Sequence, residues 1–114
     1  MQRTVLVQKG VAFNLATADY ERARTAGATV VDVCTPVEFL AGHVPGALNL
    51  DVNAADFAQK AAQLDKSKPV LVNCHAGIRG ARAAALLHEL GFDVKNLEGG
   101  LDAWEAAGNK PTGL

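Results

Sequence analysis

Short apolar runs alternate with amphipathic stretches along the whole of this chain. The runs that fit strands are Val5–Val7 with Val11–Leu15, Thr29–Val33, Ala47–Leu50, Pro69–Asn73 and Asp93–Leu97. Runs of this length, rich in valine and leucine, are typical of buried strands. Because helical patterns separate them, the alternation predicts an α/β fold. We expect a central, mostly parallel five-stranded sheet with helices on both faces.

The stretches between these runs carry apolar residues at three- and four-residue spacing. They predict helices around Ala16–Ala23, from Pro36 onward, around Phe57–Leu64, around Ala83–Leu90 and over Leu101–Ala107. Thr35 and Glu38 flank the start of the second helix in the order of a capping box. Trp104 of the last helix is expected to pack on the sheet. In such folds ligands bind beyond the carboxyl ends of the strands.

Length and composition predict one domain over residues 1–114, with residues 1–15 as an N-terminal strand or hairpin. The 114 residues are 49% hydrophobic and 20% charged, which suits a single globular core. The formal net charge is -1 without a basic block, so nucleic acid is not an expected partner. No apolar run reaches the roughly 20 residues that cross a membrane. Two cysteines without a disulfide framework, and no secretory signal, predict a cytoplasmic protein.

The segment from Pro69 to Leu90 is the most informative part of the chain. An apolar strand ends at Cys74, a tight loop leads to Arg79, and a helical pattern begins at once. A thiol at the mouth of such a loop faces converging backbone N–H groups and the positive end of the helix. These surroundings favour the thiolate, which is the form that attacks. We therefore predict that Cys74 is a nucleophile.

Four stretches in order make the chain resemble a single-domain rhodanese, the sulfurtransferase family. They are VVDV at 30–33, EFLAGHVPGALNL at 38–50, VNCHAGIRGARAAALLHELGF at 72–92 and NLEGGLDAWEAAG at 96–108. The resemblance covers roughly residues 17–111. It implies transfer of sulfane sulfur from thiosulfate or another persulfide donor, through a Cys74 persulfide, to cyanide or a thiol. A protein sulfur acceptor is a further expected partner, and no cofactor is expected.

The resemblance also implies which residues bind the substrate. Cys74 matches the catalytic cysteine, and the cradle after it consists of His75, Ala76, Gly77, Ile78, Arg79 and Gly80. Gly77 permits the curl of the loop, and Arg79 offers a fork of donors suited to an oxyanion. The family often has a polar residue after the cysteine, Asn before the arginine and Ser or Thr after it. Here His75, Ile78 and Gly80 make the entrance less charged, which favours thiol-borne or protein-borne persulfides over thiosulfate.

Residues near the end of a neighbouring strand are auxiliary candidates. Cys34 stands where the family usually has arginine, so Glu38 lacks its usual arginine partner. Cys34 either resolves or accepts sulfur from Cys74, or it is a small apolar residue that fills the vacated space; the second interpretation is favoured. Asp32 is expected to orient the active-site loop through backbone N–H groups. No metal site is expected, because the histidines are scattered and the cysteines do not form a C-x-x-C pair.

Two other functions compete with sulfur transfer on the same residues. A non-catalytic module would bind a partner and use Cys74 only to hold or carry sulfur. A phosphatase or arsenate reductase of the related type carries a C-x5-R loop, with room for a tetrahedral oxyanion. The spacing here is C-x4-R from Cys74 to Arg79, so sulfur transfer is favoured.

Overall fold

The structure, a computed structural model, describes residues 13–113, and the strands in this range form one sheet. The strands are β1 (Asn14–Leu15), β2 (Thr29–Asp32), β3 (Leu48–Asn49), β4 (Val70–Asn73) and β5 (Val94–Leu97). Their order is β1-β5-β4-β2-β3, and every pair is parallel. The predicted α/β fold is therefore confirmed. The part of the predicted N-terminal strand or hairpin within residues 1–12 lies outside the described residues.

Helices follow the strands as the spacing predicts. They are α3 (Thr17–Thr25), α4 (Pro36–Ala41), α5 (Phe57–Ala61), α6 (Ile78–Glu89) and α7 (Gly100–Ala106). The predicted capping box at the start of α4 is confirmed: Thr35 Oγ1 accepts from the Glu38 N–H, and Glu38 Oε1 accepts from the Thr35 N–H. Within residues 13–113 no helix combines the length and the apolar character that a membrane span requires.

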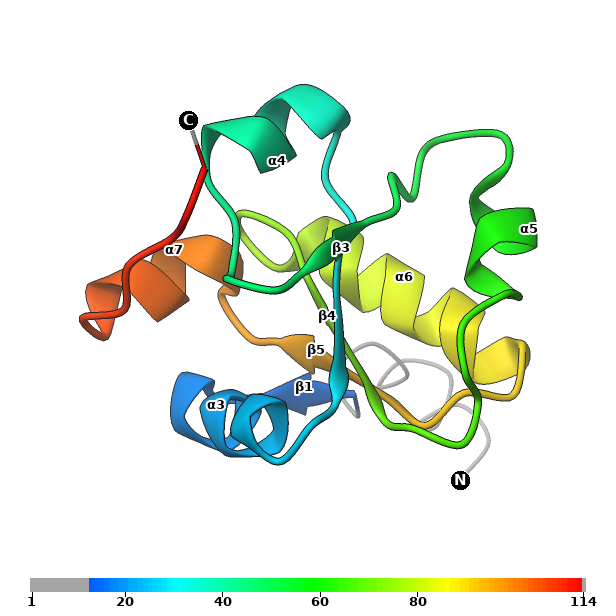
Figure 1. The fold of residues 1–114 in the computed structure, drawn as a ribbon, viewed down its shortest axis with the longest axis horizontal. Helices are drawn as coiled ribbons and strands as arrows, with labels where there is room; N and C mark the ends of the chain where they lie inside the picture. The colour runs from blue at the N-terminus through cyan, green and yellow to red at the C-terminus, as the bar shows by residue number, and fades with distance from the viewer. Residues whose placement is uncertain (1–12, 114) are drawn as a thin grey trace, which may run out of the picture.

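Helices cover both faces of the sheet, and each face has its own core (Figure 1). On one face, Val31 and Val72 pack with residues of α5 and α6. On the other, Leu71 packs with Tyr20 of α3 and with Trp104 of α7, which is buried as expected. Side chains of successive strand residues point to opposite faces, so one apolar strand serves both cores. This explains why the central strand β4 is buried throughout.

The carboxyl ends of β2 and β4 lie side by side at one edge of the sheet. These two strands pair in parallel with Asp32 opposite Asn73. The connection from β2 leads through α4 to β3, whereas the connection from β4 leads through α6 to β5 on the other side. The two connections diverge, and a crevice at the carboxyl edge is the expected result. Figure 1 shows α4 above this edge, close to the start of α6.

Candidate active site

The loop after β4 surrounds the sulfur of Cys74 with backbone donors. The N–H groups of Gly77 and Gly80 lie 3.0 Å and 3.2 Å from Cys74 Sγ and donate to it. Gly77 has a φ of 101°, a left-handed conformation that favours glycine and lets the loop curl over the sulfur. Gly80 belongs to the first turn of α6, so the positive end of that helix adds to the two donors. Together these groups stabilise negative charge on the sulfur.

The depth of Cys74 differs from the prediction. The sequence placed the thiol at the mouth of the loop, but only 1% of Cys74 is exposed and the residue belongs to the core on the α6 face. Strand alternation explains this position, because Cys74 points to the same face as Val72. The rim of the loop is formed instead by Ala76 and Ile78, and Ile78 is 81% exposed. The thiol is therefore at the floor of the loop.

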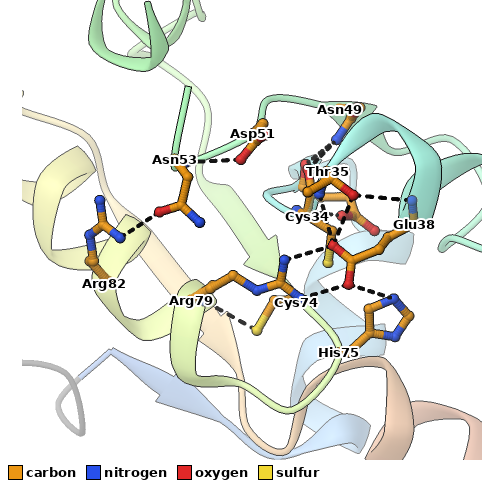
Figure 2. Close-up of polar contacts among 12 residues, drawn as sticks. Cys34, Thr35, Glu38, Asn49, Asp51, Asn53, Cys74, His75, Arg79 and Arg82 are labelled. Atoms are coloured by element: carbon orange, nitrogen blue, oxygen red, sulfur yellow. Dashed lines mark hydrogen bonds and ion pairs between the residues drawn. The ribbon is translucent and has the colours of Figure 1, made fainter. Parts of the chain in front are cut away.

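Arg79 forms an ion pair that the sequence did not predict. Its Nη1 and Nη2 donate to Glu38 Oε1 and Oε2 at 2.7 Å and 3.0 Å (Figure 2). Glu38 lacks the arginine that the family usually has at position 34, as predicted, but Arg79 pairs with it instead. Both terminal nitrogens of Arg79 are therefore already engaged. The pair forms because α4, which carries Glu38, lies close to the start of α6, which carries Arg79 (Figure 1). Because position 34 is a cysteine and offers no positive charge, the Glu38 carboxylate pairs with Arg79 of the loop.

The ion pair changes the electrostatics of the entrance. Hydrogen bonds from Arg79, and then from the Thr35 backbone, lower the pKa of Glu38 to about 2. Glu38 in turn raises the pKa of Arg79, so both groups are charged at neutral pH. His75 Nε2 lies 3.8 Å from Glu38 Oε2, on the side of the carboxylate away from the capping box. The positive charge that Arg79 would offer to an anionic donor is thus largely balanced.

Asp32 is the last residue of the neighbouring strand β2, and Cys34 lies in the turn that follows it. Asp32 was expected to orient the catalytic loop, but its Oδ1 accepts from the Cys34 N–H at 2.9 Å and so holds its own turn after β2. Cys34 is a free thiol that is buried in the same core as Cys74. Burial first, and then the nearby Asp32 carboxylate, raise the pKa of the Cys34 thiol.

The position of Cys34 bears on the predicted sulfur relay. The Val33 N–H donates to the Asn73 carbonyl, so continuation of the strand register places Val33 beside Cys74. A protonated thiol is also a poor nucleophile toward a persulfide. Both observations agree with the space-filling interpretation of Cys34, while the relay stays a prediction.

The sequence did not identify Asn96 of β5 as a residue that positions the loop. Asn96 Nδ2 donates to the Gly77 carbonyl at 3.2 Å and to Asn14 Oδ1 at 2.9 Å. Gly80 packs directly on this amide, since a Cβ atom at Gly80 would collide with Asn96 Oδ1. The absence of a side-chain hydroxyl at position 80 therefore has a steric cause. Asparagine is uncommon within a strand, so its place between Lys95 and Leu97 of β5 is the signal that could have indicated this role.

The first turn of α7 holds the loop from the other side. The Leu101 N–H donates to the Cys74 carbonyl at 2.7 Å, and the Asp102 N–H donates to the His75 carbonyl at 3.0 Å. Backbone N–H groups at the start of a helix have no partner within that helix, and here they donate to carbonyls of the loop after β4. The loop is fixed between β5 and α7, which preorganises the donors around the sulfur.

One cluster of side chains at the crevice has the composition of a metal site. The ligand atoms of Cys34, Glu38 and His75 all lie within 4.8 Å of one another. The spacing of histidines and cysteines along the chain did not predict this cluster, because its members come from three segments that only the fold brings together. Figure 2 shows the three side chains beside Cys74 and Arg79.

Comparisons with known proteins agree with this fold. Residues 16–107 match the family model of the rhodanese-like domain. The chain is 46% identical over 83 residues to the thiosulfate sulfurtransferase GlpE of Pseudomonas fluorescens (strain SBW25), covering 71% of this chain and 73% of the relative. The chain belongs to the rhodanese family, and it is a rhodanese-type transferase.

Solved structures show the same architecture. A rhodanese-related protein from Thermoplasma volcanium superposes with a TM-score of 0.79 at 28% identity, covering 87% of this chain and 96% of that one. The rhodanese-like domain of an Anabaena protein has a TM-score of 0.78 at 27% identity, covering 90% and 80%. The likeness extends over most of the chain, so the sheet and its carboxyl edge belong to a fold that these proteins share.

Proposed function

We propose that this protein transfers sulfane sulfur through a persulfide on Cys74. The Cys74 thiolate attacks the outer sulfur of thiosulfate or of another persulfide donor. A bond forms between Sγ and that sulfur, and the donor's own S–S bond breaks, so that sulfite or a thiolate leaves with the electron pair. A thiol or cyanide then attacks the outer sulfur and releases the Cys74 thiolate. Relatives named thiosulfate sulfurtransferase support this assignment.

One observation carries the proposal: two backbone N–H groups donate to Cys74 Sγ. A sulfur that is alternately a thiolate, an attacking group and a leaving group gains from fixed donors that need no reorganisation. The C-x4-R spacing of the loop further favours sulfur over the larger tetrahedral oxyanion of a phosphatase. The loop after β4 therefore holds the sulfur during both steps, and the acceptor removes it at the end of each turnover.

Intact mass spectrometry tests the proposal directly. After incubation with thiosulfate, the reduced protein should gain the mass of one sulfur atom, located by peptide mapping on Cys74. Addition of cyanide should remove this sulfur and release an equal amount of thiocyanate, repeatedly when both substrates are in excess. Loading without repeated turnover would identify a sulfur carrier instead of an enzyme. Absence of any gain with thiosulfate and with glutathione persulfide would overturn the proposal.

The Glu38–Arg79 pair predicts a preference among donors. The Glu38→Gln variant removes the carboxylate charge, while glutamine still fits the capping box of α4. Arg79 then presents its positive charge to an incoming anion, so kcat/KM for the thiosulfate dianion should rise several-fold, up to about tenfold. The effect on glutathione persulfide should be smaller, because its negative charges are spread over a larger molecule that also carries an ammonium group. Initial rates with both donors give the comparison.

A carboxylate outside the site is the control for this change. Glu105 lies exposed on α7, and Glu105→Gln removes the same charge without touching Arg79. Its donor preference should equal that of the wild type. If Glu38→Gln instead lowers kcat/KM for both donors alike, the ion pair holds the loop in shape and does not select the donor.

A further inference from the structure

The side chains of Cys34, Glu38 and His75 form a cluster near Cys74, and none of them forms or breaks a bond in the proposed sulfur transfer. It joins a thiol from the turn after β2, a carboxylate from α4 and an imidazole from the catalytic loop. We propose that these three side chains form a binding site for a thiophilic divalent cation, with Zn²⁺ as the natural occupant. Three protein ligands with one open position are the usual arrangement of an accessible zinc site.

The distances suit such an ion. Zinc binds cysteine sulfur at about 2.3 Å and imidazole nitrogen or carboxylate oxygen at about 2.0–2.2 Å, so ligand atoms around a tetrahedral ion lie about 3.3–3.6 Å apart. In the structure the ligand atoms are within 4.8 Å of one another, and the Glu38 Oε2 to His75 Nε2 distance is 3.8 Å. That distance is too long for a hydrogen bond and close to the span across a bound ion.

Glu38 retains a free ligand position although it pairs with Arg79. Its Oε1 accepts from Arg79 and from both the N–H and the hydroxyl of Thr35. Its Oε2 accepts only from Arg79 Nη2 among the described hydrogen bonds, and it faces His75. The outer oxygen therefore has a lone pair for a cation. The guanidinium keeps the carboxylate ionised and oriented, which is the usual task of groups behind a metal ligand.

Cys34 supplies the soft ligand at the base of the cluster. The buried thiol lies next to the Asp32 carboxylate, which accepts from the Cys34 backbone N–H and so fixes the turn. The negative charge of the neighbouring Asp32 carboxylate attracts a cation to this side of the cluster. On binding, the metal replaces the thiol proton, which passes to solvent. Glu38 and His75 are partly exposed, so the ion enters between them and its open position faces outward.

Cobalt binding to the reduced full-length protein tests the site without reference to activity. Co²⁺ added to metal-free protein should produce a thiolate-to-cobalt charge-transfer band and the visible bands of a tetrahedral ion, and Zn²⁺ should displace it. Cys34→Ser should abolish the charge-transfer band, whereas Cys74→Ser should retain it. His75→Ala should weaken Co²⁺ binding at least about tenfold. His88→Ala removes a histidine of α6 outside the cluster and should bind as the wild type does.

Each result decides for or against the site. A band that persists in Cys34→Ser and vanishes in Cys74→Ser would place the ion on the catalytic thiol and overturn the proposal. Absence of any band, or equal weakening by His75→Ala and His88→Ala, would also overturn it. Because His75 is partly exposed, His75→Ala keeps the test valid even if Cys34→Ser is poorly folded, and circular dichroism verifies the fold of each variant. None of these results tests sulfur transfer by Cys74, which the mass measurement after thiosulfate treatment decides.

Discussion

The Cys74→Ser variant should form thiocyanate from thiosulfate and cyanide at least about 10³-fold more slowly than the wild type. Serine keeps nearly the same volume and can accept from the same N–H groups of Gly77 and Gly80. Its hydroxyl is not ionised near neutral pH, however, and it cannot hold a persulfide. The prediction is checked with initial rates of thiocyanate formation at saturating donor.

The same variant separates the two cysteines. Serine at position 74 leaves Cys34 as the other cysteine of the chain, so intact mass after thiosulfate treatment reports on Cys34 alone. We expect no gain of sulfur, because burial and then the Asp32 carboxylate raise the pKa of the Cys34 thiol and disfavour its thiolate form. A sulfur gain in Cys74→Ser would contradict this and make Cys34 a sulfur acceptor. If the unfolding midpoint of Cys74→Ser equals that of the wild type, its loss of activity comes from the missing thiol and not from a change in folding.

The Gly80→Ala variant should lose at least about tenfold in kcat/KM and about 1–3 kcal/mol in the free energy of unfolding. The added methyl collides with Asn96 Oδ1, so the start of α6 must move away from β5. This shift carries away the Gly80 N–H that donates to Cys74 Sγ, and it disturbs the amide that holds the Gly77 carbonyl. Urea unfolding and sulfur-transfer rates measure the two effects.

Gly42→Ala is the matched control. Gly42 has an extended backbone with a φ of 172°, and a Cβ atom there would meet the Pro111 side chain at 3.6 Å, an ordinary contact. Its stability should stay within about 0.5 kcal/mol of the wild type, and its activity should be unchanged. Similar losses in both variants would mean that any added methyl group has this cost, and that Gly80 has no special role in placing the donors.

Local signals along the chain predicted most of the fold. The capping box of Thr35 and Glu38, the strand that ends at Cys74 and the helix that begins after the loop all depend on residues a few positions apart. Such features follow from hydrogen bonds and burial patterns within one turn or one strand. The parallel sheet then follows from the alternation of elements, and with it the carboxyl edge where the site lies.

The contacts that shape the site were not predicted, because they join distant segments. Arg79 and Glu38 are 41 residues apart, and which cation meets this carboxylate depends on how α4 and α6 approach across the crevice. Asn96 reaches Gly77 over 19 residues for the same kind of reason, since β5 lies beside β4 in the sheet. No spacing rule relates these positions.

The sequence by itself determined the class of fold, the candidate nucleophile and the strand–loop–helix that cradles it, since each rests on neighbouring residues and on the period of the apolar pattern. Only the tertiary structure decided that Cys74 lies at the floor of the loop, that Arg79 is bound by Glu38, and that Cys34 and His75 meet beside them. The physical reason is that depth, charge pairing and ligand clustering depend on how side chains from separate elements pack in one crevice.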